Sequence, residues 1–241
     1  MRVLVTGGSR GIGLGICTAF AERGDGVIAV CRTASPALRA LDVQIVEGVD
    51  MTSDADVATL PAAVGDGPLD AVICNAAINP YQGIDDLVAA SVLETLDVNS
   101  VGPVRVVLAL LPKLLAGSKI VLVGSGGYEH IVVPPTASVG NYAYRMSKAA
   151  LVSLGHSLAR DLRDRGIAVA ITSPGVVNTD QLRLAFETGR THWDPADAAD
   201  PVDIGRLYRD RIDELTLEMS PAWQRDPTGT LVTWPYQSTD V

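Results

Sequence analysis

The stretch TGGSRGIG at residues 6–13 decides how the rest of this chain is interpreted. It directly follows the apolar run Val3–Thr6 and opens a stretch of helical character, Gly11–Arg23. Glycines at a strand-to-helix turn permit tight backbone geometry and let a pyrophosphate approach the N–H groups at the positive end of the helix dipole. The spacing Gly-x3-Gly-x-Gly departs from the G-x-G-x-x-G dinucleotide fingerprint, so on this signal alone a turn that binds nothing stays open.

Apolar runs and helical stretches alternate beyond this turn, which is the pattern of a parallel sheet covered by helices on both faces. The expected strands are Val3–Thr6, Val27–Cys31, Val43–Val49, Leu69–Cys74, Lys119–Val123 and Ala168–Ile171. The expected helices are Gly11–Arg23, Pro36–Ala40, Ser53–Val64, Ser91–Leu115, Tyr142–Arg165 and Val202–Glu218. No linker or repeat interrupts the alternation, and we expect one α/β domain over residues 1–241.

Composition and charge exclude several classes of protein. The chain has 241 residues, of which 47% are hydrophobic and 20% charged, so a disordered or fibrous protein is excluded. A net charge of −9 without a Lys/Arg stripe argues against nucleic acid and anionic membrane surfaces. No targeting segment or apolar run of about 18 residues is present, so a cytoplasmic protein is expected. Cys17, Cys31 and Cys74 lack metal-site spacing and are interpreted as buried apolar residues, with no metal expected.

Two arginines favour a phosphorylated nucleotide cofactor. Arg32 ends the second expected strand, 19 residues after Gly13, where an NAD-binding protein carries an acidic residue for the ribose. No acid is present there, and Arg32 together with Arg10 of the glycine turn can form charge-assisted contacts with a 2′-phosphate. We therefore expect NADP(H) rather than NAD(H), the alternative being two solvated surface arginines.

A tyrosine and a lysine stand four residues apart at the start of an apolar-periodic helix. Tyr144 and Lys148 share one helix face, so the ammonium can approach the phenol. A nearby positive charge favours the phenolate and is expected to lower the pKa of Tyr144 toward values useful for proton transfer. Such pairs also arise by chance in helices, and the pair gains weight only in combination with other motifs.

That combination appears in one order along the chain: TGGSRGIG at 6–13, Asp50 after the third strand, Asn75-Ala76-Ala77 after the fourth, Asn99, Ser125 after the fifth, Tyr144 with Lys148, and PGVVNT at 174–179. Over roughly residues 3–180 this order resembles the short-chain dehydrogenase/reductase family. The resemblance implies a Rossmann-like doubly wound parallel sheet, hydride transfer to or from a nicotinamide, and a homodimer or homotetramer formed through the two long helices.

The resemblance also implies a role for each matching residue. Tyr144 acts as the general acid or base, Lys148 lowers its pKa and binds the nicotinamide ribose, Ser125 orients the substrate oxygen, and Asn99 supports a water-linked proton relay. The residues implied in cofactor binding are Gly7, Ser9, Arg10, Gly11, Ile12, Gly13, Arg32, Asp50, Met51, Asn75, Ala76, Tyr144, Lys148, Pro174, Gly175, Val177 and Thr179.

The chain departs from the family around the proposed serine. Ser125 lies 19 residues before Tyr144, whereas the family spacing is about a dozen, so either the loop 126–141 carries an insertion or another serine acts. Ser138 is the rival, although only six residues separate it from Tyr144. Tyr142 is a rival phenol on a different helix face from Lys148.

These observations predict an NADP(H)-dependent oxidoreductase that interconverts a ketone or aldehyde and an alcohol on a small organic substrate. The loops expected at the substrate, 78–83, 126–141 and the lid candidate at 180–201, contain aromatic residues and few cations, which favours an uncharged or partly aromatic substrate. The alternative is a regulator that senses NADP without catalysis. Because no histidine can be arranged with a serine and an aspartate, a hydrolase triad is disfavoured.

Overall fold

The computed structural model describes residues 1–125 and 140–220, and all six strands of that part lie in one parallel sheet. The strands are β1 (Arg2–Thr6), β2 (Gly26–Val30), β3 (Gln44–Val46), β4 (Leu69–Cys74), β5 (Leu114–Val123) and β6 (Ala168–Thr172). Their order across the sheet is β3-β2-β1-β4-β5-β6. The order reverses direction between β1 and β4, and in such doubly wound sheets the ligand crevice lies at this point, outside the carboxyl ends of the strands.

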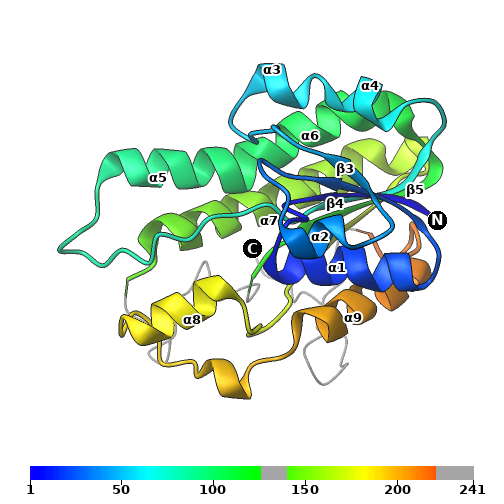
Figure 1. The fold of residues 1–241 in the computed structure, drawn as a ribbon. Coiled ribbons are helices and arrows are strands. Elements are labelled where there is room, and N and C mark those ends of the chain that lie inside the picture. The colour runs from blue at the N-terminus through cyan, green and yellow to red at the C-terminus, as the bar shows by residue number, and fades with distance from the viewer. Residues whose placement is uncertain (126–139, 221–241) are drawn as a thin grey trace.

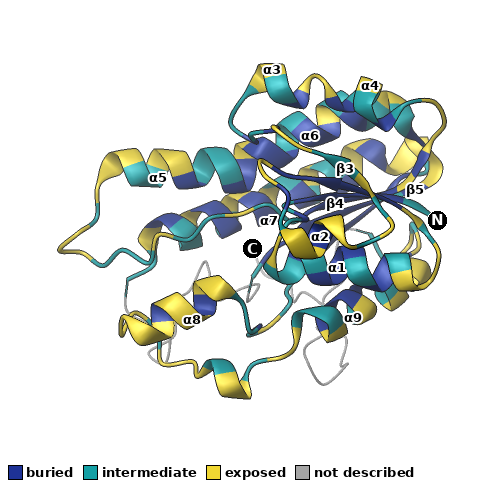
Figure 2. Ribbon diagram, in the orientation of Figure 1, coloured by how far each residue is buried: buried dark blue, intermediate teal, exposed yellow. Residues whose placement is uncertain are grey.

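Helices cover both faces of the sheet (Figure 1). One face carries α3 (Asp54–Val57), α4 (Leu60–Val64), α5 (Ala89–Leu96), α6 (Gly102–Leu110) and α7 (Tyr142–Leu162). The other carries α1 (Gly11–Glu22), α2 (Pro36–Arg39) and α9 (Pro201–Glu214), while α8 (Asp180–Glu187) lies beyond the sheet. Successive strand residues such as Leu4 and Val5 belong to different cores, one on each face, so the strands are buried throughout (Figure 2). The continuous apolar runs in the sequence follow from this burial.

The α/β alternation is confirmed, with corrections at several element ends. The helix expected over Ser91–Leu115 is interrupted by a π-helical turn at Asp97–Val101 and ends in a 3₁₀ turn at Leu111–Lys113. The next strand therefore begins at Leu114 rather than Lys119, because Pro112 ends the helix and the apolar residues around it belong to two elements. The helix expected over Ser53–Val64 is two short helices, since Pro61 starts the second one.

Smaller differences concern the other ends. The third strand is shorter than Val43–Val49, because Gly48 turns the chain with a φ of +78°. The helix expected over Tyr142–Arg165 closes with a 3₁₀ turn at Arg163–Arg165, and the last expected helix ends at Glu214 rather than Glu218. The lid candidate at 180–201 contains α8 and a 3₁₀ turn at Pro195–Asp197. Within the described residues, no helix is long and apolar enough to cross a membrane.

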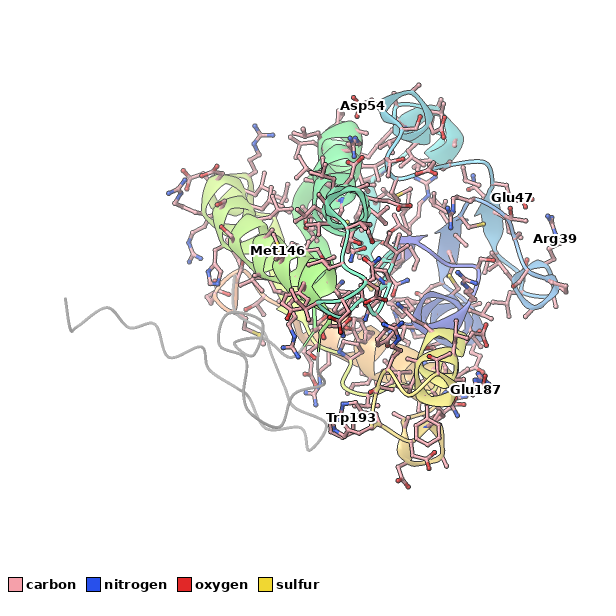
Figure 3. The ribbon with its side chains drawn as sticks, turned by 90° about the vertical axis from the view of Figure 1, so that its left-hand side faces the viewer. Arg39, Glu47, Asp54, Met146, Glu187 and Trp193 are labelled. Atoms are coloured by element: carbon pink, nitrogen blue, oxygen red, sulfur yellow. The ribbon has the colours of Figure 1, made fainter. Side chains whose placement is uncertain are left out.

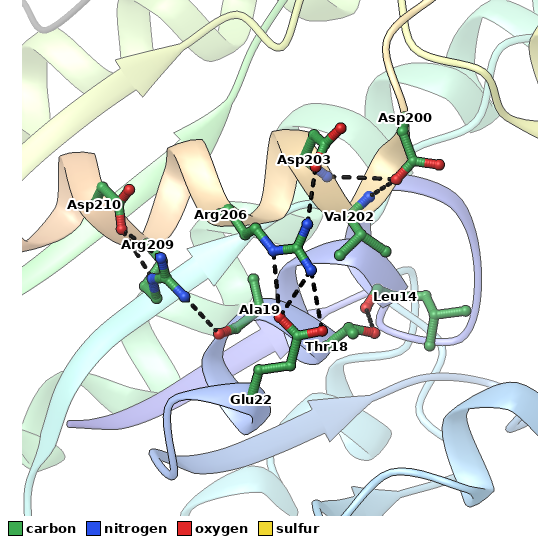
Figure 4. A network of polar contacts seen from close by, with 10 residues as sticks. All are labelled: Leu14, Thr18, Ala19, Glu22, Asp200, Val202, Asp203, Arg206, Arg209 and Asp210. Carbon is green, nitrogen blue, oxygen red and sulfur yellow. Dashed lines mark hydrogen bonds and ion pairs between the residues drawn. The ribbon is translucent and has the colours of Figure 1, made fainter.

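Helices α1 and α9 are in backbone contact although they lie far apart in the sequence. A Cβ atom at Gly15 of α1 would overlap the carbonyl oxygen of Pro201, and one at Gly205 of α9 would overlap the carbonyl oxygen of Gly15. Arg206 of α9 reinforces the contact, because its guanidinium lies 3.1 Å from the carboxylate of Glu22 (Figure 4). Helix α9 thus supports the helix that follows the glycine turn.

Candidate active site

The glycine turn places the N-terminus of α1 at the carboxyl edge of β1. Gly7 and Gly11 have φ values of +68° and +54°, a region that side chains other than glycine rarely occupy. A Cβ atom at Gly13 would overlap the carbonyl oxygen of Gly7, so the turn closes this tightly only with glycine there. No side chain caps α1 and its first turn holds no acidic residue, which leaves its N–H groups and positive dipole end suited to an anion such as pyrophosphate.

The end of β4 is tied to the glycine turn by hydrogen bonds that the sequence does not reveal. The backbone N–H groups of Asn75 and Ala76 donate to Oγ1 of Thr6 at 3.0 and 3.1 Å. The side-chain amide of Asn75 donates to the carbonyl oxygens of Thr6 and Gly7 at 3.0 and 3.3 Å. Thr6, which the motif includes without a role of its own, therefore has a structural role in the site, and Asn75 fixes the turn at the place where the strand order reverses.

Ser9 joins the glycine turn to the segment after β2. Its hydroxyl donates to the carbonyl of Thr33 at 2.7 Å and accepts from the N–H of Ser35 at 3.0 Å. The expected contact of Ser9 with phosphate would therefore fall to its backbone N–H, since the hydroxyl is engaged. Arg10 and Arg32 are exposed beside this junction, and neither guanidinium has a hydrogen bond or ion pair with a described residue.

Asp50 and Met51 lie past the end of β3, on the same side as Arg32. The carboxylate of Asp50 accepts from the N–H and hydroxyl of Thr52 at 2.8 and 2.7 Å, and these bonds lower its pKa with a smaller contribution from Arg32. Met51 is buried, and its carbonyl accepts from Arg105 at 3.1 Å. Both residues therefore follow β3, the strand next to β2, and their expected role at the adenine stays a prediction.

Tyr144 and Lys148 lie in the first turns of α7, at the carboxyl end of β5. The ammonium of Lys148 is buried, donates to the carbonyl of Val123 at 2.7 Å, and stands 5.4 Å from the centre of the Tyr144 ring. The phenol of Tyr144 is hydrogen-bonded to the side chain of Ser125. Three of the four expected catalytic side chains are therefore grouped at one strand end, with Ser125 rather than another described serine at the phenol.

The pKa values at this group correct one expectation. Burial raises the pKa of Tyr144 to about 12; the hydrogen bond to Ser125 opposes the rise and the nearby Tyr81 adds to it. Burial also lowers the pKa of Lys148 to about 8. The lowering of the tyrosine pKa that we expected from the lysine is therefore wrong, because burial dominates the pKa of both groups and Lys148 is not among the causes that act on Tyr144.

Asn99, the fourth expected catalytic residue, lies in the π-helical turn and is fully buried. Its side chain accepts from the N–H of Ile78 at 2.8 Å and donates to the carbonyl of Ile78 at 2.9 Å and to Oγ of Ser147 at 2.9 Å. The Ser147 hydroxyl in turn donates to the carbonyl of Tyr144 at 2.7 Å. Asn99 therefore holds the loop after β4 against the first turn of α7, a positioning role that its residue type alone does not predict.

The stretch 174–179 crosses toward the glycine turn. A Cβ atom at Gly11 would lie 3.2 Å from the Thr179 side chain, so Thr179 stands against the N-terminus of α1. The Thr179 hydroxyl accepts from the N–H of Leu182 and begins α8. Val177 is buried and pairs with Ala199, while Gly175 turns the chain with a φ of +74°. This part of the expected nicotinamide wall is therefore fixed between α1 and the segment before α9.

Some expected residues lie elsewhere or outside the described part. Ser138 and most of the loop 126–141 are outside the described residues. Tyr142, the rival phenol, is 40% exposed at the start of α7. Figure 3 views the carboxyl edge of the sheet, with Arg39 and Glu47 on one side and Met146 of α7 on the other. Within residues 1–125 and 140–220, no three His, Cys, Asp or Glu side chains are grouped as metal ligands.

Comparison with known proteins agrees with this geometry. The family model for short chain dehydrogenases matches residues 1–189. A 1-hydroxy-2-glutathionyl-2-methyl-3-butene dehydrogenase of Rhodococcus sp. (strain AD45) is 32% identical over 234 residues, covering 96% of this chain and 99% of that protein. A cyclic-di-GMP-binding biofilm dispersal mediator protein of Escherichia coli (strain K12) is 29% identical, covering 74% of this chain and 73% of its own.

Two solved structures share the fold. A carbonyl reductase from chicken fatty liver, with NADPH bound, has a TM-score of 0.81 at 23% identity, covering 97% of this chain and 98% of its own. A short chain dehydrogenase from Burkholderia cenocepacia J2315, in complex with NADP, has a TM-score of 0.77 at 27% identity, covering 93% and 96%. With a family model matched over most of its length, this chain belongs to the short-chain dehydrogenase family of oxidoreductases.

Proposed function

We propose that this protein is an NADP(H)-dependent oxidoreductase that interconverts a ketone or aldehyde and an alcohol on a small organic substrate. The observation that carries the proposal is the group at the carboxyl end of β5, where the Tyr144 phenol is hydrogen-bonded to Ser125 and stands over the Lys148 ammonium. The group and the glycine turn both lie at the carboxyl edge of the sheet, where doubly wound sheets bind their ligands, so we expect a substrate oxygen and a nucleotide to meet there.

Tyr144, Ser125 and Lys148 have different roles in the proton transfer. Bound nicotinamide supplies or accepts the hydride, which is chemistry the side chains cannot provide. Tyr144, whose pKa of about 12 keeps it protonated at neutral pH, donates a proton to the carbonyl oxygen during reduction. Ser125 orients the same oxygen by a hydrogen bond, and the Lys148 ammonium stabilises negative charge on the phenol after the transfer. Alcohol oxidation requires the phenolate, so its rate should increase with pH.

The preference for NADP(H) rests on the two exposed arginines. Arg10 and Arg32 flank the junction of the glycine turn with the segment after β2, and their guanidinium groups are available for a 2′-phosphate. The NADPH and NADP named with the two structural neighbours agree with this preference. The nicotinamide end is assigned to Pro174, Gly175, Val177 and Thr179, and the adenine end to Asp50 and Met51.

The relative from Rhodococcus suggests where to look for the substrate. Its name describes an alcohol that carries a glutathionyl group, and the match covers nearly all of both chains. We propose an alcohol with a thioether substituent of this kind as the first substrate to test, together with a panel of uncharged aryl and alkyl ketones.

The experiment is turnover by the purified protein with a matched active-site variant. NADPH consumption with the ketones and NADP⁺ reduction with the thioether alcohol should both be lost in Tyr144→Phe, while the affinity for NADPH stays within about twofold. Retention of a tenth of kcat by the variant would place the proton donor elsewhere. Tight NADPH binding without any turnover would favour the alternative, a nucleotide-sensing regulator, in keeping with the ligand-binding relative from Escherichia coli.

A further inference from the structure

Tyr81 adopts a backbone conformation that its side chain disfavours. Its φ is +52°, and Tyr81 and Asn141 are the two non-glycine residues with positive φ among residues 1–125 and 140–220. A left-handed conformation is tolerated by glycine and asparagine but is unusual for a bulky aromatic residue. Such strain persists only where the surroundings impose it, and it is concentrated at functional sites.

The surroundings impose it here through contacts with four separate elements. Asn99 of the π-helical turn binds both backbone groups of Ile78. Gln181 of α8 donates to the carbonyl of Asn79, and Asn141 at the start of α7 donates its N–H to the carbonyl of Gln82 at 2.9 Å. The fourth element is the turn after α8, described next.

Arg190 fixes the backbone of Tyr81 itself. Its guanidinium donates to the carbonyl of Tyr81 at 2.9 Å and pairs with the carboxylate of Asp86 at the same distance. On the other side, the N–H of Tyr81 donates to the side chain of Asn79 at 3.1 Å. Both backbone groups of Tyr81 are therefore held, and the conformation is set by partners on the loop and beyond α8 rather than by local preference.

Tyr81 lies close enough to the group at the end of β5 to influence Tyr144 electrostatically. The residue is half-buried, its hydroxyl is hydrogen-bonded to the Asn79 side chain, and its proximity contributes to the raised pKa of Tyr144. The loop that carries Tyr81 is bonded to α8 through Asn79 and to the start of α7 through Gln82, so Tyr81 stands in a segment held between these two elements. A large ring held in a strained conformation beside the reacting phenol is suited to contact a substrate.

We propose that Tyr81 is the specificity-determining residue of the substrate site, with its ring forming the wall that receives the bulkier substituent of the ketone. The proposal rests on the function proposed above and adds the orientation of the substrate. A ring on one side of the carbonyl carbon decides which face of the carbonyl is turned toward the hydride. The ring therefore sets the ratio of the two alcohol enantiomers as well as the affinity.

The test separates the ring from the backbone strain. Tyr81→Phe keeps the ring, whereas Tyr81→Asn removes the ring and places a residue that tolerates positive φ. Ile84→Ala is the loop control, because Ile84 is 69% exposed three residues further along. Acetophenone and cyclohexyl methyl ketone serve as probes, and their binding to the protein saturated with NADP⁺ is measured by calorimetry, where no turnover can occur. NADP⁺ affinity and the melting temperature are measured for each variant.

We expect Tyr81→Asn to bind both ketones at least tenfold more weakly, with unchanged NADP⁺ affinity and an equal or higher melting temperature. Tyr81→Phe and Ile84→Ala should bind the ketones within about twofold of the original chain. Reduction of acetophenone with NADPH should then give an enantiomer ratio that shifts toward one to one in Tyr81→Asn only. If Tyr81→Asn leaves the ketone affinities and the enantiomer ratio unchanged, the proposal for Tyr81 is overturned, whereas the proposed function still holds. Failure of the original chain to bind NADP⁺ or either ketone overturns both.

Discussion

Lys148 is a buried cation whose site favours its neutral form. Burial lowers its pKa from an ordinary 10.5 to about 8, so between these values the unfolded chain binds more protons and stability increases with pH. Below pH 8 the ammonium is charged in both states, and its burial costs roughly 3 kcal/mol. The hydrogen bond from the ammonium to the Val123 carbonyl offsets only part of that cost.

Lys148→Met should therefore stabilise the protein at pH 7 by about 1–2 kcal/mol while abolishing turnover. Urea unfolding of both proteins at pH 7 and pH 9.5 checks this, and the advantage of the variant should shrink at the higher pH because the original lysine is then neutral. A variant less stable than the original at both values would contradict a net cost of burying the ammonium.

Arg32→Asp tests the cofactor preference at the same scale. The substitution replaces a cation available to the 2′-phosphate with an acid that repels it and can accept a bond from a ribose hydroxyl. We expect the ratio of kcat/KM for NADPH over NADH to fall at least tenfold. Arg39→Asp is the control, since Arg39 is already paired with Glu47 at 2.6 Å. An unchanged ratio in Arg32→Asp would mean that other groups bind the phosphate.

At the scale of residues, the sequence predicted which side chains lie together better than it predicted their surroundings. Ser125, Tyr144 and Lys148 were expected together and lie together, because their order along the chain follows strand ends that meet at one edge. The direction of the tyrosine pKa was wrong, since it depends on how many atoms surround the phenol, and spacing carries no such information. Tyr81 lies in a loop that was expected at the substrate, but its positive φ was not expected, and Thr6 was given no role of its own. Both features depend on partners distant in the sequence.

At the scale of elements, the contact between α1 and α9 gives a sharp stability prediction. Gly15→Ala would force apart two backbones, because the added Cβ overlaps the carbonyl of Pro201. We expect a loss of about 1–3 kcal/mol in the free energy of unfolding and weaker NADPH binding, since α1 carries the glycine turn. In the control Gly26→Ala the new Cβ has no neighbour closer than 3.8 Å. If Gly15→Ala is as stable as the original chain, α9 can shift to make room for the added methyl group.

Element ends were harder to predict than element types. The run of apolar residues around Pro112 continues from α6 into β5, and both elements are buried, so hydrophobic periodicity does not mark the boundary. The π-helical turn at Asp97–Val101 was also not expected, because it arises from packing Asn99 and Ser100 against Ser147 across a distance of nearly fifty residues. The existence of the strands and their order along the chain were predicted, since each contains an apolar run, but the bounds of β3 and β5 were not.

At the scale of the whole molecule, we predict association through the helices on one face of the sheet. Leu93 of α5 and Leu108 of α6 are 67% and 63% exposed, and Met146 of α7 is 51% exposed. Large apolar side chains exposed in this way are typical of surfaces that bind a partner. Light scattering at micromolar concentration should therefore give two or four times the 25.3 kDa of one chain.

Leu108→Glu should reduce the measured mass to that of a single chain, because it places a charge in the contact. Leu115→Glu is the matched control: Leu115 is 57% exposed but lies in β5 rather than in these helices. If the original protein has the mass of a single chain, the prediction of association is wrong. If Leu108→Glu leaves the mass unchanged, the contact between chains does not include Leu108.

The paired glycines of α1 and α9 also limit how this chain can be recombined with its relatives. The family match ends at residue 189, whereas the helix that fits against Gly15 begins at Pro201. A chimera that joins residues 1–189 of this chain to the C-terminal part of a relative would keep Gly15 but lose Gly205, the residue that lets α9 approach it. In descendants of this chain, positions 15 and 205 should therefore change together, and residues 1–189 should tolerate exchange only together with α9.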